Sequence, residues 1–128
     1  MKYILMLLLI LGCSKPEPVR RVFFVEPRDG AELSSPFKVQ FGVENLVVEP
    51  AGEIKPNSGH HHLLINLDST PEGEGIPFDD THKHFGKAQT ETELNLEPGK
   101  YKLTLQFANG AHQSYGKLLS ETISISVK

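Results

Sequence analysis

Apolar and polar residues alternate along much of this chain with the period of two that is typical of half-buried β-strands. In residues 37–43 every second position is Phe or Val, and Lys38 and Gln40 stand between them. Residues 121–128 repeat the pattern, with Ile and Val at alternate positions and serines between them. No segment shows the 3.6-residue period of an amphipathic helix. The pattern therefore predicts an all-β fold.

Turn residues divide the apolar segments into about seven short strands. Two loops rich in Pro, Gly and acidic residues are predicted at 49–59 and 68–80. The sequence EPGK at 97–100 lies between two alternating segments and predicts a hairpin. Short strands at this density predict an immunoglobulin-like antiparallel β-sandwich, without the Cys and Trp residues that mark antibody domains.

The start of the chain has a different character. Lys2 is followed by an apolar run over residues 3–11, and the only cysteine, Cys13, comes two residues later. The run is shorter than the roughly 20 residues that a membrane-spanning helix needs, and it has the form of a secretory signal peptide. Its end resembles the lipobox of bacterial lipoproteins, in which the cysteine is lipidated and becomes the mature N-terminus. The alternative is an ordinary signal peptide beside a coincidental cysteine.

The leader and the strands together define the expected organisation of the chain. We predict a signal peptide at 1–12, a lipidated tether at 13–20 and one β-sandwich domain at 21–128. The tether contains two prolines and mixed charges, a composition that does not pack into a core. The domain is therefore expected outside the cytoplasm, in the cell envelope, and attached to a membrane through the lipid on Cys13.

Composition narrows the possible functions. The formal net charge of the 128 residues is −3, whereas nucleic-acid-binding domains are usually strongly basic. Glycine-rich phosphate loops are also absent from the sequence. Beyond Cys13 the chain has no cysteine and no methionine. The domain therefore offers no disulfide, and no sulfur ligand for a soft metal ion.

Histidines are the residues that suggest a function. The chain has six, of which five form two tight groups, His60 to His62 and the pair His82 and His84. In a strand, residues i and i+2 share a face. The alternation that follows at residues 63–67 predicts that His61 points into the core and that His60 and His62 lie on the opposite face.

Each His-x-His pair therefore presents two imidazoles about 6 to 7 Å apart at their Cα atoms. If the two strands meet, the rings of His60, His62, His82 and His84 converge on one point, and His112 is a fifth candidate ligand. Imidazoles without sulfur ligands favour Cu(II), Zn(II) or Ni(II) over Cu(I). The sequence thus predicts a site for a divalent transition metal.

Several neighbours of these histidines allow two interpretations. Asp79 and Asp80 would be further ligands or partners that orient an imidazole. Gly86 would let the backbone approach another group closely. Lys87 would face an anion near the histidines or, the interpretation that we favour, lie solvated in a plain turn. His61 is either part of the site or a hydrogen-bonded core residue.

The same histidine segments carry a resemblance. The sequences GHHH (59–62), THKHFGK (81–87) with QTE (89–91), and His112 in HQSYG closely resemble the DUF4399 family of small exported bacterial domains of unknown function. The resemblance extends over residues 21–128. It implies an exported domain built around these histidines, and it implies no particular activity.

Three classes of function remain open. The first, which we predict, is an envelope lipoprotein that binds Cu(II) or Zn(II) through its histidines. The second is a zinc hydrolase with three histidine ligands, an activated water and Asp79 or Asp80 as the base; we do not favour it because no nucleophile elbow or acid/base pair is present. The third is a structural or interaction domain, in which the histidines form a hydrogen-bonded cluster or, with Lys87, an anion site. The expected partners are a membrane and a metal ion, no nucleic acid is expected, and the sequence identifies no protein partner.

Overall fold

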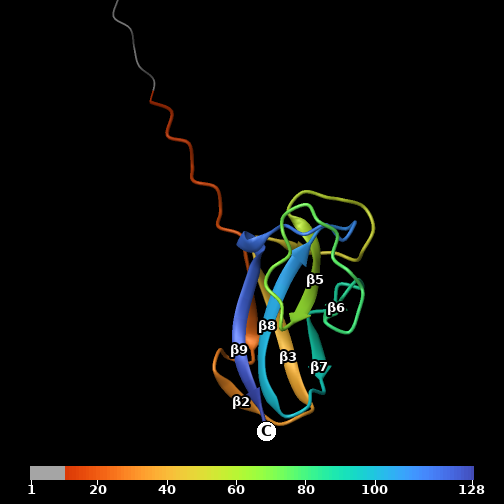
Figure 1. Ribbon diagram of the computed structural model, residues 1–128. Helices are drawn as coiled ribbons and strands as arrows, with labels where there is room; N and C mark the ends of the chain where they lie inside the picture. The colour runs from red at the N-terminus through yellow and green to blue at the C-terminus, as the bar shows by residue number, and fades with distance from the viewer. Residues whose placement is uncertain (1–10) are drawn as a thin grey trace, which may run out of the picture.

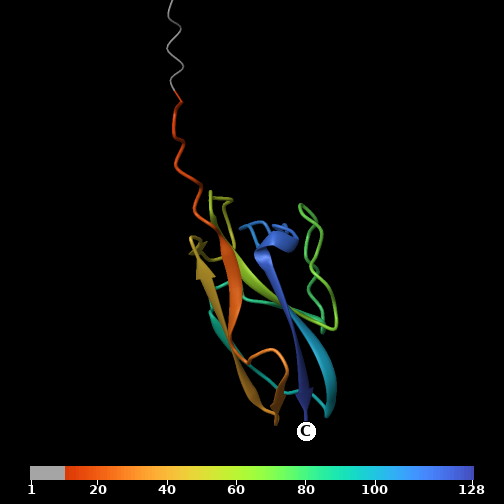
Figure 2. The ribbon, with the colours of Figure 1, turned by 90° about the vertical axis from the view of Figure 1, so that its left-hand side faces the viewer.

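The computed structural model describes residues 11–128, and its strands form two sheets that pack face to face (Figures 1 and 2). The smaller sheet has the order β1-β3-β7. Its strands are β1 (Arg21–Glu26), β3 (Phe37–Glu44) and β7 (Glu91–Leu94). The larger sheet has the order β2-β9-β8-β5-β4, and β6 pairs with β5. Its strands are β2 (Ala31–Leu33), β4 (Val47–Val48), β5 (Ser58–Ile65), β6 (His82–His84), β8 (Gly99–Ala108) and β9 (Ser120–Val127). The predicted all-β sandwich is confirmed.

The strand pairings refine the prediction in two ways. Most neighbouring strands are antiparallel, whereas β2 runs parallel to β9 and β4 runs parallel to β5. The described residues contain nine strands instead of about seven. Three of them, β2, β4 and β6, have three residues or fewer, which is too short for a pattern of alternation to predict. Apart from a short 3-10 helix, η1 (Lys117–Leu119), no helix is present in residues 11–128. None of the described segments is a helix long and apolar enough to cross a bilayer.

The hairpin predicted around residues 97–100 is wrong. β7 pairs with β3 in the smaller sheet, and β8 lies in the larger sheet between β5 and β9. Both edges of β8 are therefore occupied, and the turn carries the chain from one sheet to the other. A turn sequence shows only that the chain reverses direction. Which strand pairs with β8 depends on the other strands of the larger sheet, and β5 and β9 take both of its edges.

The core lies between the two sheets and is built from the alternating residues that the sequence indicated. Val39 and Phe41 of β3 face Leu63 of β5 and Phe107 of β8, and all four are at most 3% exposed. Their burial supplies most of the stabilisation, at about 1.5–3 kcal/mol for each large apolar side chain.

The outer face of the larger sheet is mostly polar, and two loops, residues 66–81 and 109–116, cover the part of it that β5 and the second half of β8 form. Buried polar side chains of β8 hold these loops to the sheet. The hydroxyl of Thr104 donates to the carbonyl of Leu67 at 2.7 Å. The amide oxygen of Gln106 accepts from the N–H of Thr70 at 3.0 Å. This covered outer face is where the histidines lie.

Candidate metal centre

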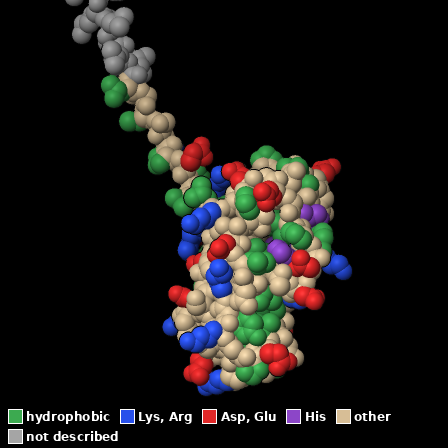
Figure 3. Space-filling view, in the orientation of Figure 1, with side chains coloured by type: hydrophobic (Ala, Val, Ile, Leu, Met, Phe, Trp, Pro, Cys, Tyr) green, Lys and Arg blue, Asp and Glu red, His purple; other side chains and the backbone are tan. Residues whose placement is uncertain are grey.

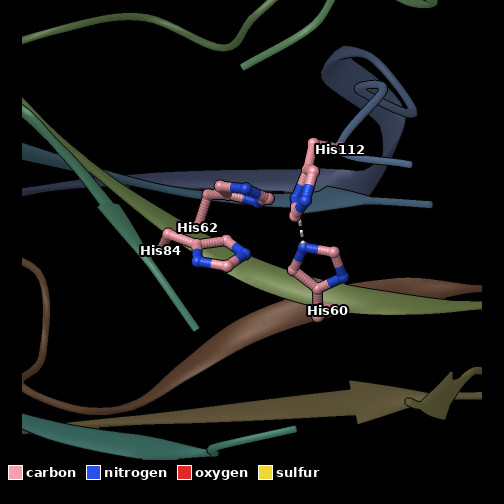
Figure 4. A group of neighbouring side chains, drawn as sticks. All are labelled: His60, His62, His84 and His112. Atoms are coloured by element: carbon pink, nitrogen blue, oxygen red, sulfur yellow. Dashed lines mark hydrogen bonds between the residues drawn. The ribbon is translucent and has the colours of Figure 1, made fainter. Parts of the chain in front are cut away.

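Four imidazoles converge on the outer face of β5, beneath these loops (Figure 4). One ring nitrogen from each lies within 4.8 Å of the others. They form the four-histidine group, which consists of His60 and His62 on β5, His84 on β6 and His112 in the loop after β8. The structure thus brings together four of the five histidines that the sequence selected.

Strand register explains how three of these rings meet. His60 and His62 are two residues apart on β5 and therefore share its outer face. β6 pairs antiparallel with β5 so that His84 lies directly opposite His62. Side chains of directly opposed residues stand about 5 Å apart. The ring centroids of His62 and His84 are accordingly 5.2 Å apart.

The fourth ring depends on a tight loop. Ala108 lies opposite His60 in the β5–β8 ladder, and the chain turns back immediately after it. The side-chain oxygen of Asn109 accepts from the N–H groups of Ala111 and Gln113 at 2.9 and 3.1 Å. His112 adopts a left-handed backbone conformation with φ of 64°. The loop thereby directs the Nδ1 of His112 to within 3.0 Å of the Nε2 of His60.

Most nitrogens of this group have no hydrogen-bond partner. His60 and His62 are fully buried, and His84 and His112 are partly exposed. The Nδ1 of His60, both ring nitrogens of His62 and the Nε2 of His84 are buried without a partner. A buried polar group left unpaired costs about 1–3 kcal/mol. A metal ion bound through the ring lone pairs would remove part of this cost, so the residues present fit an ion.

The surroundings keep these rings neutral. Burial, followed by the neighbouring rings, lowers the pKa of His60 to about 4 and that of His62 to about 2. Burial and then His112 also lower the pKa of His84. Neutral imidazole is the form that binds a metal, so these three rings are held in their binding form at neutral pH.

The donor set restricts the kind of ion. The four-histidine group supplies only nitrogen, with no carboxylate and no thiolate among its members. Such a set suits Cu(II) and Zn(II). Nitrogens bound to one tetrahedral ion at about 2.1 Å lie roughly 3.4 Å apart. The widest separation, at most 4.8 Å, must therefore shorten by no more than roughly 1.4 Å, a distance within reach of side-chain rotation.

Two residues beside the group shape it further. A Cβ atom on Gly86 would lie 2.2 Å from the Cε1 of His84, so the glycine lets that ring rest on the backbone, the close approach that the sequence predicted. Phe78 is 62% exposed, and its ring stands perpendicular to His84 and His112 at centroid distances of 4.6 and 5.1 Å. Sequence reasoning missed Phe78, and its only signal was an aromatic residue in a polar loop.

His82, the fifth predicted ligand, lies outside the group. The β5–β6 register places it opposite Leu64, two residues along β6 from His84. Its Nδ1 is 2.7 Å from the Oδ1 of Asp79. Hydrogen bonds from His82 and then Thr81 hold the pKa of the Asp79 carboxyl at about 2. Asp79 thus orients His82 and not a member of the group.

His61 points into the core, as the alternation predicted. It is fully buried, and its ring centroid lies 5.1 Å from that of Phe41 and 5.2 Å from that of Phe107. Neither of its ring nitrogens has a hydrogen-bond partner. The expectation of a hydrogen-bonded core histidine is therefore wrong: aromatic rings pack against His61 and offer its nitrogens no hydrogen-bond acceptor.

The remaining predicted residues are not members of the four-histidine group. Lys87 is exposed, and its backbone N–H donates to the side chain of Gln89 at 2.8 Å, as expected of a plain turn. Asp80 is exposed. Histidine side chains reach the surface at two places on the face shown in Figure 3. Cys13 is exposed, most of the predicted signal peptide lies outside the described residues, and lipidation stays a prediction.

Fold and site together define a class of protein: a two-sheet β-sandwich with converging histidines on the outer face of one sheet. The chain belongs to the family described as "Domain of unknown function (DUF4399)", whose model matches residues 39–128 and so includes the whole four-histidine group. No curated protein matches the chain.

One solved structure is similar in fold, the endo-beta-1,4-mannanase from Thermotoga petrophila. It is 13% identical, with a TM-score of 0.54, over 89% of this chain. The chain spans 21% of the length of that protein, and a likeness at this identity shows the fold alone.

Proposed function

We propose that this protein binds one divalent transition-metal ion, Cu(II) or Zn(II), through the four-histidine group. The observation that carries the proposal is the convergence of four ring nitrogens within 4.8 Å, in a group where four of the eight ring nitrogens are buried without a hydrogen-bond partner. Folding has brought these polar rings together from three separate segments at a cost in free energy. A bound ion is the partner that all four can share.

The cellular setting of this proposal is the envelope. An apolar leader followed at once by Cys13 supports export and lipid attachment of the chain to a membrane. An extended segment without strands separates Cys13 from β1, as suits a tether. In this setting the domain would take up, hold or sense a metal ion outside the cytoplasm.

The alternative is a structural cluster in which the histidines brace two loops through hydrogen bonds. One observation favours it, the 3.0 Å contact between His60 and His112. The nitrogens of His62 argue against it, because a bracing ring would have at least one hydrogen-bond partner and His62 has none. A bound metal would give a partner to one nitrogen of His62 and to the Nε2 of His84, which the hydrogen-bonded cluster leaves unpaired.

Calorimetric titration of the metal-free protein with Zn(II) and with Cu(II) tests the proposal. We expect one ion per chain, and replacement of a ligand by His84→Ala should weaken binding by about a hundredfold or more. His82→Ala is the matched control, since it removes a histidine from the same strand and should leave the affinity unchanged. Binding weaker than about 10 µM for every divalent ion, or equal losses in both variants, would refute the proposal.

A further inference from the structure

The charge of the four-histidine group is the starting point. Four neutral imidazoles supply no negative charge, so a divalent ion among them keeps both of its positive charges. Proteins usually offset such charge with a carboxylate ligand, or with carboxylates and carbonyls that accept from the outward N–H of each metal-bound ring. No carboxylate belongs to the group. The rings of His60 and His62 also have no acceptor behind them.

Two aspartates, Asp79 and Asp80, come just before β6. Asp80 is exposed and is not a member of the group, and Asp79 is already engaged. The Oδ1 of Asp79 accepts from the backbone N–H and the hydroxyl of Thr81 and lies 2.7 Å from the ring of His82. Moving it to the metal would break all of these hydrogen bonds. Because a buried charge without compensation is unfavourable, the missing negative charge has to come from a group other than the four histidines and Asp79.

The centre has one side through which such a charge can arrive. His60 and His62 are fully buried, whereas His84 and His112 are partly exposed. Phe78 lies against these two exposed rings and is itself 62% exposed. A ligand from solution therefore meets the ion beside His84 and His112 and under the edge of Phe78.

We infer that the four-histidine group holds its ion together with a small anion, a carboxylate or a halide, bound to the ion on the side of His84 and His112. The inference rests on the proposed metal binding and adds a second ligand to it. The anion neutralises part of the charge of the ion and adds a fifth ligand to the four ring nitrogens. The centre then holds a metal–anion pair and not a bare ion.

Azide, a small anion whose bond to Cu(II) gives a charge-transfer absorption, tests this inference. The chain from residue 13 onward is used, since it contains every described strand and the whole core; Cys13→Ser removes the only thiol. The protein is loaded with one equivalent of Cu(II) in a buffer free of halide and carboxylate, and azide is then titrated.

We expect the absorption to appear and saturate, and added acetate to suppress it by competition. Absence of the absorption at about 100 mM azide, with copper still bound, would overturn the anion site and leave the metal site standing. Failure of both Cu(II) and Zn(II) to bind would overturn both proposals; if Zn(II) alone binds, the Phe78→Glu comparison described below decides. An Asp80→Asn variant tests whether the chain itself supplies the negative charge through the carboxylate of Asp80. If azide binds to this variant and not to the wild type, the charge comes from Asp80 and the inference is wrong.

A substitution that supplies the charge from within the chain gives an independent test. Phe78 is exposed and touches both outer rings, so Phe78→Glu places a carboxylate beside the ion, and Phe78→Gln is the neutral control of equal size. Phe78→Glu should bind Zn(II) about tenfold or more tightly than Phe78→Gln, the order expected for a close pair of opposite charges. It should also lose the azide absorption. Equal affinities of the two variants would show that the charge of the ion needs no partner.

Discussion

The two faces of β5 place the same kind of side chain in opposite surroundings. On the inner face His61 lies between Phe41 and Phe107, and neither of its nitrogens is bonded. On the outer face, His60 and His62 meet two further imidazoles within 4.8 Å. Three consecutive histidines therefore divide into one isolated ring and two members of a candidate metal centre. The neighbours that folding supplies, and not the residue type, decide which role a histidine has.

The largest expected effect is the stabilisation of the fold by a bound metal ion, which should depend on the outer face of β5 and not on the inner face. At a free Zn(II) concentration a thousand times the dissociation constant, bound ion should stabilise the fold by about 4 kcal/mol. His62→Leu should reduce this gain to about 1.4 kcal/mol or less, the value left after a hundredfold loss of affinity, whereas His61→Leu, the same change on the other face, should retain it. Thermal unfolding with and without Zn(II) measures the difference. An undiminished gain in His62→Leu would mean that the outer face is no metal site.

The second effect concerns the inner face and acid. Burial, followed by His60, lowers the pKa of His61 from 6.5 to about 4, so between these values the unfolded chain binds a proton that the folded chain excludes. The stability due to neutral His61 is therefore complete above about pH 6.5 and is lost as the pH falls toward 4, by roughly 3 kcal/mol.

His61→Leu should remove this loss from the metal-free protein. Urea unfolding of the wild type and the variant at several pH values measures the difference between their free energies of unfolding. The advantage of the variant should grow as the pH falls below 6.5. A constant difference across this range would show that His61 does not titrate as a buried core residue.

The smallest effect tests how precisely the outer face is built. Gly86→Ala places a methyl group 2.2 Å from the Cε1 of His84, so the ring must move away from its partners. Metal affinity should fall by about tenfold, which equals about 1.4 kcal/mol, while the fold persists. Gly75→Ala is the control, because its Cβ meets nothing within 4 Å. Equal affinities in both variants would mean that the position of His84 matters little.

Local sequence predicted the strands and their faces well. The alternation around Val39 and Phe41, and the opposite orientations of His61 and His62, follow from the two-residue period of a strand. Predictions from local sequence failed where the outcome depends on pairing between strands that are far apart in the chain. The turn at 97–100 indicated a hairpin, yet β8 already has a neighbour on each side. His82 and His84 looked equivalent, and only the register against β5 places His84 opposite His62.

The sequence by itself determined an all-β domain, the inward direction of His61 and a set of histidines suited to a divalent metal. These conclusions depend on side-chain periodicity and donor chemistry, which are local properties. Only the tertiary structure decided that His112 joins the group and His82 does not, and that Phe78 covers it. Those outcomes depend on strand register and on loops that fold back over the sheet, and both are set by packing between residues far apart in the chain.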